Sequence, residues 1–194
     1  MIGSIRGHIL FKAPPRLTVE AGGLGYELEA PMSTFFHLPG VGEEVRLLTH
    51  LVVREDAHVL YAFGTEDERR LFRNVIKVSG VGPKIGLALL SGISVEAFTT
   101  CVHNQDLTAL TKIPGIGRKT AERLVVEMRD RLVEHNEAAQ VGAPGGGAES
   151  EAFGALIALG YKPAEASRLL KSAGPGEHST EELIRRALQG AVRE

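Results

Sequence analysis

The stretch Val78-Ser79-Gly80-Val81-Gly82-Pro83-Lys84 recurs 35 residues later as Ile113-Pro114-Gly115-Ile116-Gly117-Arg118-Lys119. Each copy places two glycines on either side of one aliphatic residue and ends in a lysine. The flanking positions also correspond: Val75 with Leu110, Lys77 with Lys112, and Leu89 with Leu124. The repeat predicts two copies of one unit, in which a helix, a tight turn and a second helix follow each other.

The two glycines allow a turn with positive φ, which we expect at Gly82 and Gly117, and allow close approach of another molecule. The aliphatic residue is expected to turn inward, while N–H groups of the following helix form an anion site that the nearby lysine reinforces. The predicted phosphate-binding residues are Gly80, Val81, Gly82, Lys84, Gly115, Ile116, Gly117, Arg118 and Lys119. One such turn is also an ordinary helix–helix connection. Two in register favour a tandem helix–hairpin–helix module, which binds the DNA backbone without reading bases.

Composition excludes several classes of protein. The chain has 194 residues, 43% of them hydrophobic, and a formal net charge of −2, which indicates a globular protein. The single Cys101 excludes an internal disulfide framework and a cysteine-based zinc site. Neither a membrane span nor a signal peptide is expected, so a cytoplasmic location is predicted. Residues 71–131 carry nine basic and five acidic side chains, which indicates a polyanion-binding segment.

The sequence predicts a multidomain α+β protein. Residues 1–64 contain five short β-rich runs between Gly and Pro turns, which indicates a five-stranded OB-fold barrel. Residues 65–135 form the helical DNA-binding module, 136–150 a flexible linker without basic or aromatic residues, and 151–194 a three-helix domain. Helices are expected over 66–78, 83–91, 94–102, 105–112 and 118–134, and in the tail over 151–159, 163–172 and 179–189.

Enzyme chemistry is not indicated. The seven histidines have neither metal-ligand nor triad spacing. Lys119-Thr120 resembles the end of a phosphate-binding P-loop, but Arg118 stands where that motif needs glycine. We therefore expect no catalytic residue, no metal site and no cofactor in this chain.

Two carboxylates, Glu55 and Asp56, lie between the fourth and fifth β-rich runs. They are either a solvated turn or a negative projection that repels phosphates beside a DNA-binding face. Single-strand binding is disfavoured, because Phe11, Tyr26, Tyr61 and Phe63 lie in strand runs where core packing explains them. In the tail, the run Leu156–Tyr161 fits either ordinary core packing or an apolar docking patch.

Over its whole length the chain resembles the RuvA family, whose members are the junction-binding subunits of the bacterial RuvAB branch-migration complex. The resemblance rests on the Met1-Ile2-Gly3 opening, Arg54-Glu55-Asp56, both hairpins, Lys119–Leu124 and Ala158–Pro163. It implies a homotetramer, alone or paired as an octamer, that holds a four-way (Holliday) junction open and square. It also implies a UBA-like third domain.

The resemblance further assigns roles to residues. Glu55 and Asp56 match the acidic pin that guides strand separation. Leu156, Leu159, Tyr161 and Leu188 match the surface that engages RuvB, the hexameric ATPase that uses ATP and Mg²⁺, and the RuvC resolvase is implied in the larger complex. Two alternatives stay open: a helix–hairpin–helix nuclease or glycosylase, and an architectural duplex-binding protein without a motor.

Overall fold

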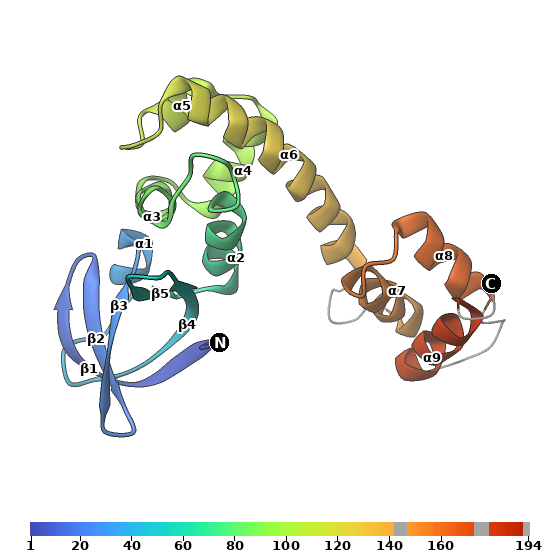
Figure 1. Ribbon diagram of the computed structural model, residues 1–194, viewed down its shortest axis with the longest axis horizontal. Coiled ribbons are helices and arrows are strands. Elements are labelled where there is room, and N and C mark those ends of the chain that lie inside the picture. Colours follow the sequence, from blue (N-terminus) through green and yellow to red (C-terminus); the bar gives the residue numbers. More distant parts are fainter. Residues whose placement is uncertain (142–146, 173–178, 192–194) are drawn as a thin grey trace. The chain divides into compact units, whose positions relative to one another are not determined.

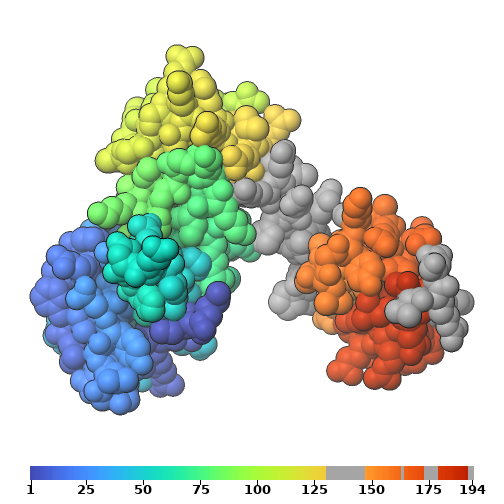
Figure 2. Space-filling model, viewed as in Figure 1, coloured from blue at the N-terminus to red at the C-terminus, as the bar shows by residue number. Residues whose placement is uncertain are grey.

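The computed structural model describes residues 1–141, 147–172 and 179–191. The chain divides into two compact units, Met1–Asp130 and Arg131–Glu194, and each contains its own hydrophobic core. The first unit is a strand-built part followed by helices, and the described part of the second holds the end of one long helix and three further helices (Figure 1). In Figure 2 the barrel (blue) and the helices after it (green to yellow) form one continuous body. The predicted multidomain α+β architecture is confirmed.

Five strands close into a barrel in the order β1-β2-β3-β5-β4. They are β1 (Ser4–Ala13), β2 (Arg16–Ala21), β3 (Leu24–Glu29), β4 (Glu44–Val53) and β5 (His58–Phe63). Strands β3 and β5 pair in parallel, and the other neighbours are antiparallel. This closed five-stranded barrel confirms the OB-fold expected from the spacing of the β-rich runs.

Strand β1 pairs with both β2 and β4, and these pairings close the barrel. Ile5 and Ile9 point into the core, as the alternation of a half-buried strand requires. A Cβ atom built at Gly7, between them, would lie 1.8 Å from the carbonyl oxygen of Glu20. Only glycine therefore lets the two strands approach this closely.

A β-bulge follows in β1 and corrects one expectation. The register with β2 shifts between Ile9 and Phe11, which leaves Leu10 as the extra residue. Both Leu10 and Phe11 consequently face outward and are about half exposed. Tyr61 and Phe63 are buried as expected, but the assignment of Phe11 to the core was wrong.

The helices of the first unit are α1 (Met32–Phe35), α2 (Glu66–Val75), α3 (Pro83–Gly92), α4 (Val95–His103), α5 (Leu107–Thr111) and α6 (Arg118–Val141), which continues into the second unit. All but α1 were expected. Helices α4 and α5 begin slightly later than predicted because the preceding side chains cap them. Ser94 Oγ accepts from the Ala97 N–H at 3.1 Å, and Asp106 Oδ1 accepts from the Ala109 N–H at 3.0 Å.

The predicted linker, 136–150, overlaps helix at both ends. Helix α6 continues to Val141, and helix α7 begins at Ala148. Alanine, glutamate and glutamine, which occupy 137–140, are good helix formers and extend α6 beyond the end expected at 134. Residues 142–146, at the centre of the predicted linker, lie outside the described part of the chain.

An aromatic cluster joins the helices to the barrel. The Phe72 ring of α2 lies 4.9 Å from the Phe63 ring and 5.0 Å from the Tyr61 ring of β5, between centroids. On its other side Phe72 meets α3, where a Cβ built at Gly86 would lie 3.0 Å from the ring. Phe72 is fully buried. Strand β5, α2 and α3 therefore pack through one side chain.

A carboxylate provides a second connection between barrel and helices. Glu68 of α2 accepts hydrogen bonds from the hydroxyl groups of Ser33 and Thr34 in α1, the latter at 3.1 Å. It also accepts from the N–H groups of Gly64 and Thr65, at 3.1 and 3.3 Å. The Thr65 hydroxyl in turn accepts from the Glu68 N–H, which completes a capping box. One buried side chain thus connects β5, α1 and the start of α2.

Beyond the end of α6, the described part of the second unit contains α7 (Ala148–Ala158), α8 (Pro163–Ser172) and α9 (Thr180–Ala191). Their apolar faces enclose a small core, as the sequence predicted for the tail. Among the described residues no single helix is long and apolar enough to cross a membrane. One bent pair, α3 with α4, meets that criterion when the two helices are counted together.

We expect the Glu68→Ala substitution to lower the free energy of unfolding by about 3 kcal/mol, because it leaves buried hydroxyl and N–H donors without an acceptor. Urea unfolding followed by circular dichroism measures the change. The control is Asp67→Ala: Asp67 is exposed, its ion pair is with Arg70 on the helix surface, and its removal should cost at most about 1 kcal/mol. Equal effects of the two substitutions would contradict the role assigned to Glu68.

Candidate nucleic-acid interface

The two repeated stretches form turns with the same hydrogen bond. The Val81 N–H donates to the carbonyl of Val78, and the Ile116 N–H donates to the carbonyl of Ile113, both at 3.0 Å. The first glycine of each turn has the same φ of 87°. The first hairpin joins α2 to α3, and the second joins α5 to α6. The duplication seen in the sequence is therefore a duplication of backbone structure.

The aliphatic residue of each hairpin is buried. Val81 is 3% exposed and Ile116 is 4% exposed. Their N–H groups are also engaged within the turns. Neither residue is thus placed to contact a phosphate, although both were included among the predicted phosphate-binding residues. They anchor the hairpins to the core, as the inward orientation predicted.

The second glycines do not have the backbone conformation that we expected. Positive φ occurs at Gly80 and Gly115, whereas Gly82 has a φ of −87° and Gly117 is not in the positive region. The expectation of positive φ at Gly82 and Gly117 was wrong, because each directly precedes a helix and begins its hydrogen-bonding. A Cβ built at either position meets nothing within 4 Å. Neither strain nor internal packing requires glycine there, and the backbone at both positions is open to close approach by another molecule.

Unpaired backbone donors lie next to these open positions. The first intrahelical bonds are from the Gly86 N–H to the Gly82 carbonyl, at 3.0 Å, and from the Ala121 N–H to the Gly117 carbonyl, at 2.9 Å. The N–H groups of the preceding turn have no intrahelical acceptor and carry the positive end of the helix dipole. Pro83 lacks an N–H group, so the first hairpin has one donor fewer than the second.

Cationic side chains surround both helix starts. Lys84, Arg118 and Lys119 are exposed, and Arg118 makes only a surface ion pair with Glu122, at 3.2 Å. Each hairpin therefore combines backbone donors, a helix N-terminus and at least one cation. That arrangement binds an anion such as a phosphate.

Direct contacts connect the two hairpins. The Arg123 guanidinium of α6 donates to the Ser79 hydroxyl of the first hairpin, at 3.3 Å. A Cβ built at Gly115, in the second hairpin, would lie 3.3 Å from the Ile85 side chain of α3. These contacts set the spacing of the two hairpins within one unit.

Arg73, in the basic segment 71–131, has a structural role instead, as does Arg69 just before that segment. The Arg69 guanidinium donates to the Gly3 carbonyl at 2.7 Å, and Arg73 donates to His50 Nδ1 at 3.3 Å, so both tie α2 to the barrel. Burial, together with the nearby charges of Arg73 and Arg69, lowers the pKa of His50. The net charge of the middle segment therefore overstates the cations available to a ligand.

The acidic pair lies at the tip of a β-hairpin. Between β4 and β5 the Arg54 N–H donates to the Ala57 carbonyl at 2.9 Å and closes a short turn. Glu55 and Asp56 are both exposed within it. The carboxylates therefore project from the barrel, a geometry that suits both interpretations of the pair.

The tail residues separate into buried and accessible ones. Leu156 is fully buried in the core of the three helices, so it does not present a docking surface and that part of the expectation is corrected. Leu159 is 61% exposed, and Tyr161 and Leu188 are half-buried against the core. The turn after α7 places Leu159 outside, because the chain reverses at Gly160, which has a φ of 97°.

Metal-ligating side chains are dispersed over the part of the chain that the structure describes. Among these residues no group of three or more His, Cys, Asp or Glu side chains is placed to hold a metal ion. Cys101 is half-buried, and burial raises the pKa of its thiol, which lowers its reactivity at neutral pH.

A closed five-stranded barrel followed by two equivalent hairpins defines a protein of the tandem helix–hairpin–helix class. Comparison with protein families gives three consecutive matches. These are the RuvA N terminal domain over residues 1–62, a SAM-like helix-hairpin-helix tandem over 72–130, and the RuvA C-terminal domain over 147–191.

Curated relatives match over their whole length. Proteins of Nitrosococcus oceani and Methylococcus capsulatus, both called Holliday junction branch migration complex subunit RuvA, are 54% identical to this chain. The alignments cover 97% of the chain and 98% of the first relative, and all of the chain and of the second. A Vibrio cholerae protein of the same name is 50% identical over 99% of the chain and 100% of its own length. The chain belongs to the RuvA family.

The geometry predicts different consequences for the two glycines of a hairpin. Gly80→Ala and Gly115→Ala should each lower the free energy of unfolding by about 1–2 kcal/mol, because an L side chain is strained at positive φ. Gly82→Ala should cost only about 0.5 kcal/mol, the difference between glycine and alanine before a helix. Urea unfolding of the variants measures this contrast, and a larger decrease for Gly82→Ala than for Gly80→Ala would contradict it.

Proposed function

We propose that this chain binds four-way junction DNA by structure rather than sequence. The observation that carries the proposal is the pair of equivalent hairpins, each with open glycine backbone, unpaired N–H donors and exposed cations. Backbone donors and cations recognise phosphates, which are the same at every base pair, so the contacts position DNA without reading it. The printed names of the full-length relatives, which place them in a Holliday junction branch migration complex, support the choice of a junction.

We further propose that the chain acts as a homotetramer that holds the junction open and square, with octamers forming from two tetramers. A four-way junction has four equivalent arms, and four copies supply one set of hairpins for each. The barrel and the connection between β3 and β4 carry exposed apolar side chains that a self-association surface would cover: Leu10, Phe11, Leu24, Phe36, Val41 and Val53.

In this proposal the chain is a subunit without catalytic residues, and branch migration is driven by a partner. The partner is the RuvB ATPase, which would use ATP and Mg²⁺, and the RuvC resolvase would join the larger complex. The three-helix unit supports this role, because exposed Leu159 and half-buried Tyr161 and Leu188 leave apolar surface on a separately folded domain. Such a domain recruits a partner by raising its local concentration.

Junction binding should depend steeply on salt, and the slope should fall by about 0.9 for each phosphate that a variant no longer neutralises. We expect Lys84→Ala and Lys119→Ala to weaken binding equally for all sequences and to reduce this slope. Fluorescence anisotropy titrations at several salt concentrations measure both quantities, for a junction, a duplex and a single strand. Lys171→Ala, in the second unit, is the matched control for removal of one positive charge.

The same titrations distinguish the alternatives. Equal affinity for junction and duplex would favour an architectural duplex-binding protein, and DNA cleavage would favour a nuclease.

The acidic turn gives a second test. We propose that Glu55 and Asp56 act as a pin that opposes uninterrupted duplex at the crossover, since like charges about 4 Å apart repel by roughly 1–4 kcal/mol between the dielectric of water and that of a protein surface. Glu55→Gln with Asp56→Asn should tighten duplex binding more than junction binding and so lower the junction preference. The measurement is the ratio of the two dissociation constants at fixed salt.

The control for this test removes two carboxylates elsewhere, as Glu149→Gln with Glu165→Gln in the second unit. Both side chains are exposed, so this variant changes net charge alone. If the ratio stays at the wild-type value in the acidic-turn variant, Glu55 and Asp56 are only a solvated hairpin tip.

A further inference from the structure

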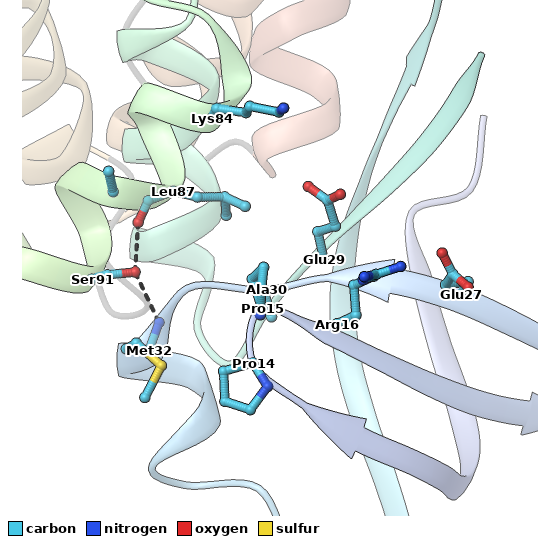
Figure 3. A pocket seen from close by; sticks show the side chains of 11 residues that line it. Pro14, Pro15, Arg16, Glu27, Glu29, Ala30, Met32, Lys84, Leu87 and Ser91 are labelled. Carbon is cyan, nitrogen blue, oxygen red and sulfur yellow. Dashed lines mark hydrogen bonds between the residues drawn. The ribbon is translucent and has the colours of Figure 1, made fainter. Parts of the chain in front are cut away.

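A cavity of about 660 Å³ lies between the barrel and α3 (Figure 3). Its volume is in the range of roughly 300–1,000 Å³ that is usual for small-molecule sites. Apolar walls come from both sides, with Pro14, Pro15 and Met32 on the barrel side and Leu87 and Ala88 on α3. The cavity therefore has room and apolar surface for a flat ring.

Hydrogen bonds hold the two walls together. The Ser91 hydroxyl of α3 donates to the Leu87 carbonyl at 2.7 Å and accepts from the Met32 N–H at 3.0 Å (Figure 3). These bonds fasten the start of α1 to α3 beside the cavity. The cavity is consequently formed before any ligand enters, which lowers the entropy cost of binding.

The charged groups of the lining are balanced in sign. Arg16 and Glu29 are paired across β2 and β3, and Glu27 lies two residues before Glu29 on the same face of the barrel. Lys84 enters from α3, opposite Glu29. Two cations and two carboxylates give no net formal charge, which disfavours a free anion or a metal ion. A neutral group that carries both hydrogen-bond donors and acceptors fits better.

Lys84 connects the cavity to the DNA-binding surface. It belongs to the first turn of α3, where the first hairpin would hold a phosphate, and it also lines the cavity. Because this one side chain belongs to both, the cavity lies directly beside the first hairpin.

We infer that this cavity receives an unpaired nucleobase of the bound DNA. The inference rests on the proposed DNA binding and adds a site to it. Base edges combine amino donors with ring and carbonyl acceptors, which match carboxylates and a guanidinium respectively. Glu29 accepts from a base amino group, Arg16 donates to a base acceptor, and the apolar walls cover the ring faces, as in pockets that hold extruded bases. Strands that exchange partners at a junction pass through unpaired bases, and the cavity stabilises one of them.

The test uses the full chain and four-way junctions in which one arm carries a single bulged aminopurine, a fluorescent base, at successive positions. At one position we expect the emission to rise severalfold on binding, because the base leaves the stack. At the same position affinity should exceed that for the fully paired junction by about tenfold, the gain from one well-placed base contact.

Two variants change the cavity in different ways. Ala88→Phe fills it, and Glu29→Ala removes an acceptor, and each should abolish both the emission change and the affinity gain. Paired junctions should still bind to both variants with wild-type salt dependence. Glu20→Ala on β2 is the matched control, since it removes one exposed carboxylate that does not line the cavity. Circular dichroism verifies the fold, and Glu29→Ala keeps the test valid if Ala88→Phe does not fold.

Each outcome separates this inference from the proposed function. Failure of the wild-type protein to bind any junction would overturn the proposed function. Normal binding of paired junctions, without any gain from a bulged base, would overturn the inference alone. If Ala88→Phe changes the sedimentation of the DNA-free protein instead, a second copy of the chain occupies the cavity and the inference is wrong.

Discussion

The hydrogen-bonded carboxylate of Glu68 and the ring of Phe72 together fix the helices on the barrel, and the geometry of the DNA-binding surface depends on them. Glu68 accepts hydrogen bonds from two segments, residues 33–34 and 64–65. Phe72 fills the space between β5 and α3. A buried carboxylate is tolerated only when its acceptor sites are occupied. The same bonds that satisfy it thus orient α2, and α3 with the first hairpin follows from that orientation.

In each hairpin, the residues that the fold requires differ from the residue that is open to a ligand. The first glycine makes the turn possible through positive φ, and the aliphatic residue anchors the turn in the core. The second glycine has an ordinary conformation and open space around it. Intramolecular forces account for the first glycine and the aliphatic residue, whereas the second glycine leaves the backbone open to the approach of a ligand. Pro83 makes the two hairpins unequal in donor number, although their turns are the same.

The basic side chains also divide into two groups, those that stabilise the fold and those that stay exposed. Arg73, within the basic segment, and Arg69, just before it, hydrogen-bond to the barrel. Lys84, Arg118 and Lys119 stay exposed at helix starts. Lys84 is also the residue through which the first hairpin borders the cavity of Figure 3. The first hairpin and the cavity therefore share one side chain.

The sequence by itself determined the barrel, the repeated hairpins and nearly all the helices, because these depend on local signals: alternation in strands, glycine spacing in turns and the helical periodicity of apolar residues. Tertiary structure alone decided that Leu156 is buried while Leu159 is exposed, that Phe11 leaves the core at a bulge, and that positive φ belongs to the first glycine of each hairpin. It also decided the bonds of Glu68 and the meeting of Arg16 with Lys84 across a cavity. Burial, hydrogen-bond partners and cavity walls are formed by segments far apart in the chain, and only their packing brings such residues together.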